Sequence, residues 1–194
     1  DRLKASPQLE AAAARGIEVL LLSDPVDSFW TSLSLKFDDK ALRSLSQGEV
    51  DLSAVPLLTE KAEDAPAQEI EPLIGALKAA LSEQVSDVRV SKRLVTSAVC
   101  LVAPGAGPDL ALDRLLQRRN EGPGLKPVLE INPSHAMVKA AARAQAQGQA
   151  AEVADLGGLL LDQAKVLDGE LPAEPGKFVE RLNRLVTRGL SAGG

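Results

Sequence analysis

The sequence predicts an α+β fold: a small α/β layer, then a helix/β-hairpin/helix domain whose last helices form a dimeric four-helix bundle. Three apolar runs of strand length, at residues 17–22, 98–103 and 128–131, lie among longer segments with helical periodicity. Hydrophobic residues make up 45% of the 194 residues and aromatic residues only 2%. A core of Leu, Val, Ile and Ala, shared by helices and a sheet, follows from this composition.

Residues 1–45 form the first predicted unit. A short helix begins near Pro7 and ends at Gly16, since proline favours the first helical turn and glycine the C-terminal end. Residues 17–22 then form a buried strand, because nearly all of them are apolar. Two short strands flank a turn at residues 38–39. The order of elements indicates a small α/β layer.

A further helix of this unit begins at Asp24, which can act as its N-cap. Its apolar positions include the neighbouring aromatic residues Phe29 and Trp30. A buried face is the simplest interpretation of this pattern. Helical geometry places Trp30 on one side of the face and Phe29 furthest from the other apolar positions. Phe29 is therefore the ring that we expect to be exposed if either is.

Residues 46–66 are predicted to be a linker, and residues 67–194 a second unit. The linker has prolines, acidic residues and no clear period. In the second unit, a helix with Ile70, Leu73 and Leu77 on one face precedes two predicted strands, which we expect to pair as a hairpin. The remaining elements are a helix at 109–120, a strand at 128–131 and a helix that begins at Asn132-Pro133 and ends near 147.

The last third of the chain is predicted to form two helices with wide apolar faces. Two such helices cannot bury both faces on each other alone, whereas a pair from each of two copies makes a four-helix bundle. This pattern predicts a homodimer. The residues expected in its interface are Leu156, Leu160, Phe178, Leu182, Leu185 and Val186.

Gly157 and Gly158 lie inside the first of these helices, where each costs ~1 kcal/mol relative to alanine. Either the helix is weak there, or another backbone approaches it closely. The sequence leaves both interpretations open.

Composition also argues against several classes of function. The net charge is −5, without a basic stripe that would follow a phosphate backbone, so nucleic acid is not an expected partner. No run approaches the ~20 apolar residues of a membrane span. The single cysteine, Cys100, is typical of a reducing compartment and predicts a cytoplasmic location. The polar start indicates no signal peptide, and the missing initiator methionine suggests a fragment.

No arrangement of residues predicts catalysis, so we expect neither a catalytic nor a metal site in this chain. His135 is the only histidine and has no second ligand for zinc, which favours a structural role near a helix start. Gly105 and Gly107 lack the spacing and the lysine of a phosphate-binding loop. A small α/β nucleotide-binding enzyme that uses these residues remains the alternative, together with a purely structural dimerisation module.

Seven segments, in register along the whole chain, resemble the heat-shock protein 90 family of chaperones and in particular its bacterial HtpG branch. The segments at 17–24 and 129–135 are the most specific. The seven are Ser6-Pro-Gln-Leu-Glu10, Gly16-Ile-Glu-Val-Leu-Leu-Leu-Ser-Asp24, Phe37-Asp38, Val88-Arg-Val-Ser-Lys-Arg-Leu94, Leu129-Glu-Ile-Asn-Pro-Ser-His135, Leu159-Leu-Leu-Asp-Gln-Ala164 and Phe178-Val-Glu-Arg-Leu-Asn183.

The resemblance implies that residues 1–45 are the end of a middle domain and that residues 67–194 are a C-terminal dimerisation domain. It implies a homodimer that binds unfolded or partly folded clients, while ATP and Mg²⁺ bind in an N-terminal domain outside this chain. This fragment itself would then be no enzyme and would need no cofactor. The client-binding positions that it implies are Phe29, with Trp30 beside it, and the helix containing Leu112, Leu115 and Leu116.

Overall fold

The computed structural model describes residues 3–24, 27, 36–46, 52, 54–58, 63–105, 109–119, 121 and 124–192. The elements at the start of the chain are the 3-10 helices η1 (Leu3–Ala5) and η2 (Pro7–Leu9), the helix α1 (Glu10–Ala13) and the strands β1 (Lys36–Phe37) and β2 (Lys40–Ala41). The elements that follow are α3 (Ala67–Leu81), β3 (Asp87–Val90), β4 (Val99–Val102), α4 (Leu110–Gln117), β5 (Val128–Ile131), α5 (Ala136–Ala146), α6 (Ala150–Leu167) and α7 (Pro175–Ala192). This arrangement confirms the α+β class.

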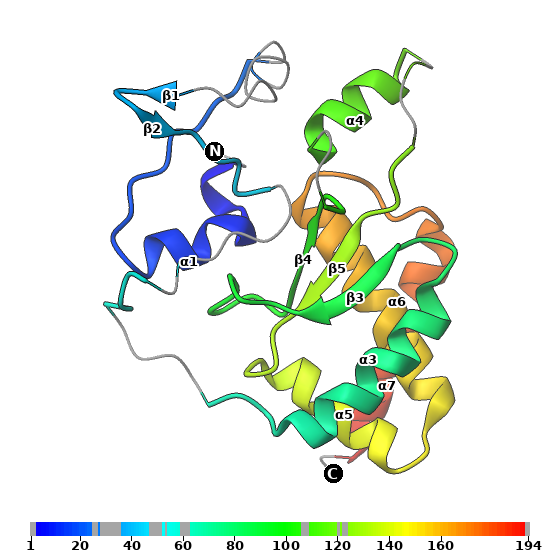
Figure 1. Ribbon diagram of the computed structural model, residues 1–194. Helices are drawn as coiled ribbons and strands as arrows, with labels where there is room; N and C mark the ends of the chain where they lie inside the picture. Colours follow the sequence, from blue (N-terminus) through cyan, green and yellow to red (C-terminus); the bar gives the residue numbers. More distant parts are fainter. Residues whose placement is uncertain are drawn as a thin grey trace.

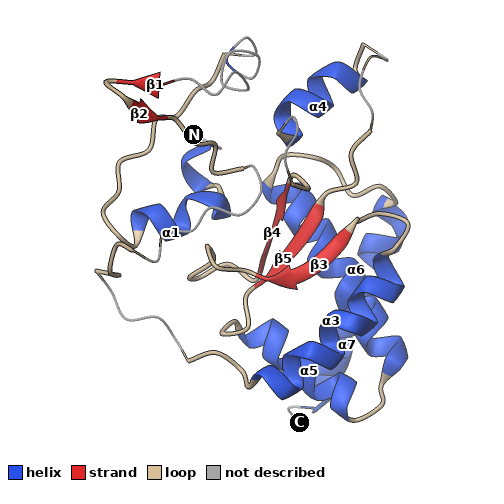
Figure 2. Ribbon diagram, viewed as in Figure 1, coloured by secondary structure: helices blue, strands red, loops and turns tan. Residues whose placement is uncertain are grey.

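Strands β3, β4 and β5 form a three-stranded sheet in the order β3-β5-β4 (Figure 2). β5 pairs parallel with β3 and antiparallel with β4. The expected hairpin between β3 and β4 is therefore wrong, because β5 lies between them. All four residues of β5 are buried, as a central strand with covered faces requires.

Helices α3, α5 and α6 pack together against the sheet and form the main core with it (Figure 1). The apolar face of α3 repeats at helical spacing and is buried through Ile70, Leu73 and Leu77, as predicted. α6 contributes Leu160 and Leu161 to the same core. α4 lies at the opposite end of the sheet from α5 (Figure 1).

The predicted strand at 17–22 is not formed. These residues follow the end of α1, where Gly16 adopts a positive φ of 66°, but they pair with no strand in the described part of the chain. The side chain of Leu20 is 74% exposed. A strand exists only where a neighbour accepts its backbone hydrogen bonds, and an apolar run alone does not provide that neighbour.

The predicted turn at residues 38–39 is confirmed. β1 and β2 pair antiparallel across it, and Asp38 and Asp39 have positive φ values of 49° and 60°. Two consecutive residues with positive φ form the two-residue turn that best matches the twist of a hairpin, and aspartate tolerates this conformation better than most residues.

Candidate functional site

Helices α6 and α7 lie antiparallel and are joined by a row of ion pairs. Arg181 lies 3.5 Å from Asp162, Arg184 lies 2.5 Å from Asp155, and Arg188 lies 2.7 Å from Glu152. The arginines follow one another at helical spacing along α7, and their partners do so along α6. These ion pairs therefore hold one side of α7 against α6. Sequence analysis missed this row, although the alternating spacing of three and four residues was its signal.

The opposite side of α7 exposes an apolar stripe. Leu182 is 41% exposed and Val186 is 51% exposed. Val179 and Leu190 extend the stripe at the same helical spacing and are also exposed. Of the other predicted interface residues, Leu156, Phe178 and Leu185 are half-buried. Leu160 is 0% exposed and packs in the chain's own core, so its side chain is not available to another copy.

The two glycines of α6 mark close approaches of other side chains. A Cβ atom at Gly157 would lie 2.6 Å from Cδ2 of Leu77 on α3. A Cβ atom at Gly158 would lie 2.7 Å from the guanidinium carbon of Arg181. The absent side chains thus let α3 pack closely on α6 and let Arg181 lie across α6 beside Asp162. A close approach exists at both positions, but it is made by side chains and not by the second backbone that the sequence suggested.

We expect Gly157→Ala to lower the free energy of unfolding by about 1 kcal/mol. Alanine adds helix propensity, but the new methyl group overlaps Leu77 in a packed core, where overpacking costs typically ~1–3 kcal/mol. The matched control is Gly75→Ala, since nothing lies within 4 Å of its Cβ position on α3. This control should stabilise the chain by about 0.5–1 kcal/mol in urea unfolding. Equal stabilisation by both changes would contradict the close approach.

The predicted client helix, α4, is partly turned inwards. Asp109 caps it by accepting a 2.8 Å hydrogen bond from the N–H of Leu112. The Leu112 side chain is buried, whereas Leu115 and Leu116 are half-buried and keep part of their surface accessible. Of the three predicted leucines, the latter two are therefore the ones that another protein can reach in this conformation.

The predicted aromatic pair, Phe29 and Trp30, lies outside the described residues. The start of its helix is described: the Asp27 carboxylate accepts a 3.0 Å hydrogen bond from the N–H of Asp24. This is the return bond of an N-terminal capping box, in which the third helical residue binds the N–H of the cap. The predicted helix start at Asp24 is consistent with this bond.

A buried ionic cluster is centred on Glu130 of β5. Its Oε1 accepts a 2.8 Å hydrogen bond from Nη2 of Arg89, and its Oε2 accepts one of 2.8 Å from Nε of Arg93 and one of 2.9 Å from the Ser91 hydroxyl. The Cys100 thiol lies 3.9 Å from the same oxygen. Burial, followed by the charge of Glu130, raises the pKa of Cys100 well above its ordinary value. The thiol is therefore protonated at neutral pH, as a structural cysteine would be.

Two other residues of the 129–135 segment organise the neighbouring backbone. The amide of Asn132 donates a 2.9 Å hydrogen bond to the carbonyl of Ser97, in the connection between β3 and β4. His135 is the N-cap of α5, and its Nδ1 accepts a 3.2 Å hydrogen bond from the N–H of Met137. The structural role predicted for His135 is thus confirmed.

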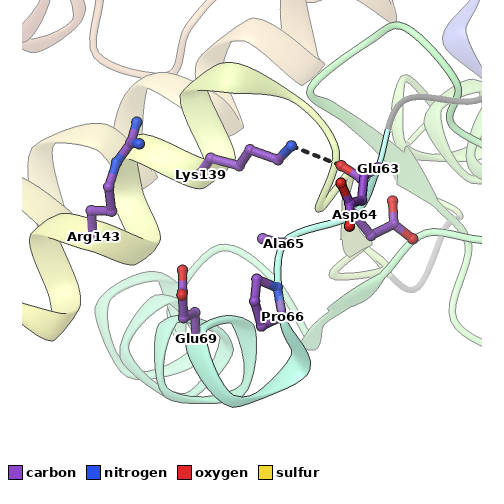
Figure 3. Close-up of a pocket in the computed structure, with 7 residues that line it drawn as sticks. All are labelled: Glu63, Asp64, Ala65, Pro66, Glu69, Lys139 and Arg143. Atoms are coloured by element: carbon purple, nitrogen blue, oxygen red, sulfur yellow. Dashed lines mark hydrogen bonds between the residues drawn. The ribbon is translucent and has the colours of Figure 1, made fainter.

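A hollow of about 310 Å³ lies between the start of α3 and the side of α5 (Figure 3). Residues of both charges line it: Glu63, Asp64, Ala65, Pro66, Glu69, Lys139 and Arg143. Lys139 reaches across the hollow and donates a 2.7 Å hydrogen bond to the carbonyl of Glu63 (Figure 3). The mixed charges do not select a phosphate or a cation, so this lining resembles an ordinary polar junction between helices.

The described residues contain no group of three or more His, Cys, Asp or Glu side chains that could hold a metal ion. None of the helices described is both long and apolar enough to cross a membrane.

Comparison with known proteins gives consistent matches over the whole chain. Residues 1–193 match the family model described as "Hsp90 protein". The chain is 56% identical over 192 residues to the "Chaperone protein HtpG" of Rhodopseudomonas palustris (strain BisB18), a match that covers 98% of this chain and 30% of that protein. It is 49% identical over 195 residues to the "Chaperone protein HtpG" of Mesorhizobium japonicum, which covers 99% and 31%, respectively. The chain thus spans about 30% of the length of these relatives.

Proposed function

This chain belongs to the Hsp90 protein family, and we propose that it works within a molecular chaperone of the bacterial HtpG kind by joining two copies and by holding unfolded or partly folded client proteins. Its contribution is binding rather than catalysis. The ATPase activity of such a chaperone, with its ATP and Mg²⁺, is assigned to residues outside these 194. We place the chaperone in the cytoplasm.

The observation that carries this proposal is the two-sided character of α7. Ion pairs hold one side of the helix to α6, while the opposite side exposes a stripe of Val179, Leu182, Val186 and Leu190. Contiguous exposed apolar surface of this kind is typical of an interaction site. A second copy, related by two-fold symmetry, would cover the stripe with its own α7 and complete a four-helix bundle.

The molecular mass in solution tests the dimer. Sedimentation equilibrium of the 194-residue chain should give twice the mass of one chain, and a version truncated before Glu174 should give a monomer, because it lacks α7. A monomer in both cases, at concentrations up to about 100 µM, would remove the dimer from the proposal.

Client holding is proposed for the exposed apolar residues of the two units. Leu115 and Leu116 on α4 are half-buried, and Leu20 and Phe37 in the first unit are exposed. Each contact with an apolar client segment would be weak. Two copies on one dimer raise the effective concentration of such sites, so a client that reaches both is held more firmly than by either alone.

Phe29→Ala should weaken the suppression of client aggregation while leaving the stability of the chain nearly unchanged. Trp30→Ala is the matched comparison, because helical geometry turns Trp30 towards the core and predicts a loss of stability for it instead. Light scattering of a heat-denatured client, with and without each variant, measures the first effect, and urea unfolding measures the second. A loss of about 3–5 kcal/mol in Phe29→Ala would identify its ring as core and end its assignment to client binding.

The same assays separate the two alternatives. A purely structural dimerisation module would form the dimer but would leave client aggregation unchanged. A nucleotide-binding enzyme would bind ATP saturably in a calorimetric titration of this chain. The Nδ1 atom of His135, one of the residues considered for such a site, already accepts a hydrogen bond from the backbone of α5.

A further inference from the structure

The start of the chain meets the second unit through hydrogen bonds rather than through a common core. The side chain of Gln8 donates a 2.7 Å hydrogen bond to the carbonyl of Leu101, and the N–H of Ala103 donates one of 3.1 Å to the carbonyl of Ser46. Within the described residues, the main apolar core contains none before Ala65. Water can replace hydrogen bonds of this kind at little cost, so a polar joint between units permits relative movement unless something fixes it.

Glu10 makes the densest contact across this joint. It is the first residue of α1, and its Oε2 accepts hydrogen bonds from the N–H groups of Val95 at 2.7 Å and Thr96 at 2.8 Å. Both carboxylate oxygens lie 3.1 Å from the N–H of Ser97. One carboxylate thus receives three consecutive backbone N–H groups from the connection between β3 and β4. Bonds to an ionised acceptor are stronger than neutral ones.

The turn at 95–97 is held from its other side by Asn132. This side chain is buried, and its amide donates hydrogen bonds to the carbonyls of Ser97 at 2.9 Å and Val95 at 3.4 Å. The N–H of Asn132 donates a further 2.8 Å bond to the carbonyl of Ala98. The carbonyls of the turn are therefore fixed to the end of β5, and its N–H groups are presented together. This geometry pre-organises the turn for a single carboxylate.

The carboxylate of Glu10 is ionised at neutral pH. Its partial burial raises the pKa, but the hydrogen bonds from the side chain and N–H of Ser97 and from the N–H groups of Val95 and Thr96 together outweigh burial and lower it below the ordinary value. The charge on which these bonds depend is therefore present under the conditions in which a chaperone works.

We propose that Glu10 is a clasp that fixes the orientation of residues 3–24 and 36–46, the described part of the first unit and its junction, on the second unit through the turn at 95–97. Opening this clasp would let the first unit turn relative to the sheet. If the function proposed above holds, the apolar residues of the first unit would then move relative to Leu115 and Leu116 on α4, so the clasp would also set the shape of the surface offered to a client.

The test uses the full 194-residue chain with spin labels at Lys40→Cys on β2 and Ala140→Cys on α5, both exposed positions. Cys100 is buried and protonated, so it does not take the label. The doubly labelled chain is mixed with an excess of unlabelled chain, so that a dimer carries labels on one copy only. Double electron–electron resonance should then give one narrow distance distribution. Glu10→Ala, which removes every bond of the clasp, should broaden or shift this distribution. Glu69→Ala, which removes an exposed glutamate from the first turn of α3, should leave it unchanged.

Hydrogen exchange shows whether the clasp itself has opened. The amides of Val95, Thr96 and Ser97 should exchange at least about tenfold faster in Glu10→Ala, while those of β5 keep their protection. Faster exchange at 95–97 with an unchanged label distance would overturn the proposal, because the joint would then be fixed elsewhere. If Glu10→Ala fails to fold, Glu10→Gln decides by the same two measurements, since it keeps the shape and loses the charge.

Client aggregation separates this proposal from the function on which its last step rests. A changed label distance with altered suppression of aggregation supports both the clasp and its role in client holding. A changed distance with unaltered suppression supports the clasp alone and counts against the link to clients.

Discussion

Glu130→Ala is expected to lower the free energy of unfolding by about 3–5 kcal/mol, because it removes one partner of a buried ion pair. The Arg93 side chain is only 4% exposed and lies 2.8 Å from the Glu130 carboxylate. Water cannot replace the lost carboxylate at that depth. Urea unfolding followed by circular dichroism, at one fixed protein concentration, measures the loss.

An exposed ion pair between α3 and β3 provides the matched control. Lys78 and Asp87 lie 2.6 Å apart, but their side chains are 48% and 42% exposed. Lys78→Ala should therefore cost no more than about 1 kcal/mol, because water and salt screen such pairs. The N–O distances of the two ion pairs are similar, so the comparison measures the effect of burial on the free energy of unfolding. Equal losses for Glu130→Ala and Lys78→Ala would show that the buried cluster adds no special stability.

The cluster gives a physical reason why the segment at 129–135 was so specific in the sequence. Glu130 binds the arginines of the β3 region, Asn132 holds the turn at 95–97, and His135 caps α5. Each of these side chains makes a specific hydrogen bond, as buried or partly buried polar groups generally do. The sequence showed that the segment was distinctive, but it did not show which residues its side chains would bind.

Features set by neighbouring residues were predictable, whereas those set by distant residues were not. The limits of β5 and the start of α4 follow from local composition, and the structure agrees with them closely. The helix expected to start at Asn132-Pro133 begins instead at Ala136, with His135 as its N-cap. The order of the sheet does not, because any short apolar strand can pair with any other. The wrong prediction of a strand at 17–22 has the same explanation. Its apolar residues predict burial, but they do not show which other segment would pair with them or cover them.

The candidate interface shows a similar limit. Leu160 and Leu182 both lie on apolar helix faces with the same periodicity, yet one is fully buried and the other is exposed. Periodicity identifies an apolar face but not the surface that will cover it. The row of arginines on α7 carried the missing information, because it marks the side of the helix that faces α6.

The exposed stripe of α7 leads to the second large effect. We expect the double variant Leu182→Glu, Val186→Glu to be monomeric while keeping the fold of the single chain. Both positions are exposed within one chain, so the carboxylates remain in water there. In the proposed bundle they would be buried, at a cost of several kcal/mol for each charge without a partner.

That cost corresponds to a dissociation constant at least about a thousandfold higher, since every 1.4 kcal/mol is a factor of ten. Sedimentation equilibrium measures the change, and an unaltered far-ultraviolet circular dichroism spectrum shows that the helices persist. Val90→Glu is the matched control, because Val90 on β3 is also 41% exposed but lies away from α7. It should leave the dimer intact. A double variant that still sediments as a dimer would place the interface on a surface other than the stripe of α7. If Val90→Glu also dissociates the dimer, added charge acts without regard to its position.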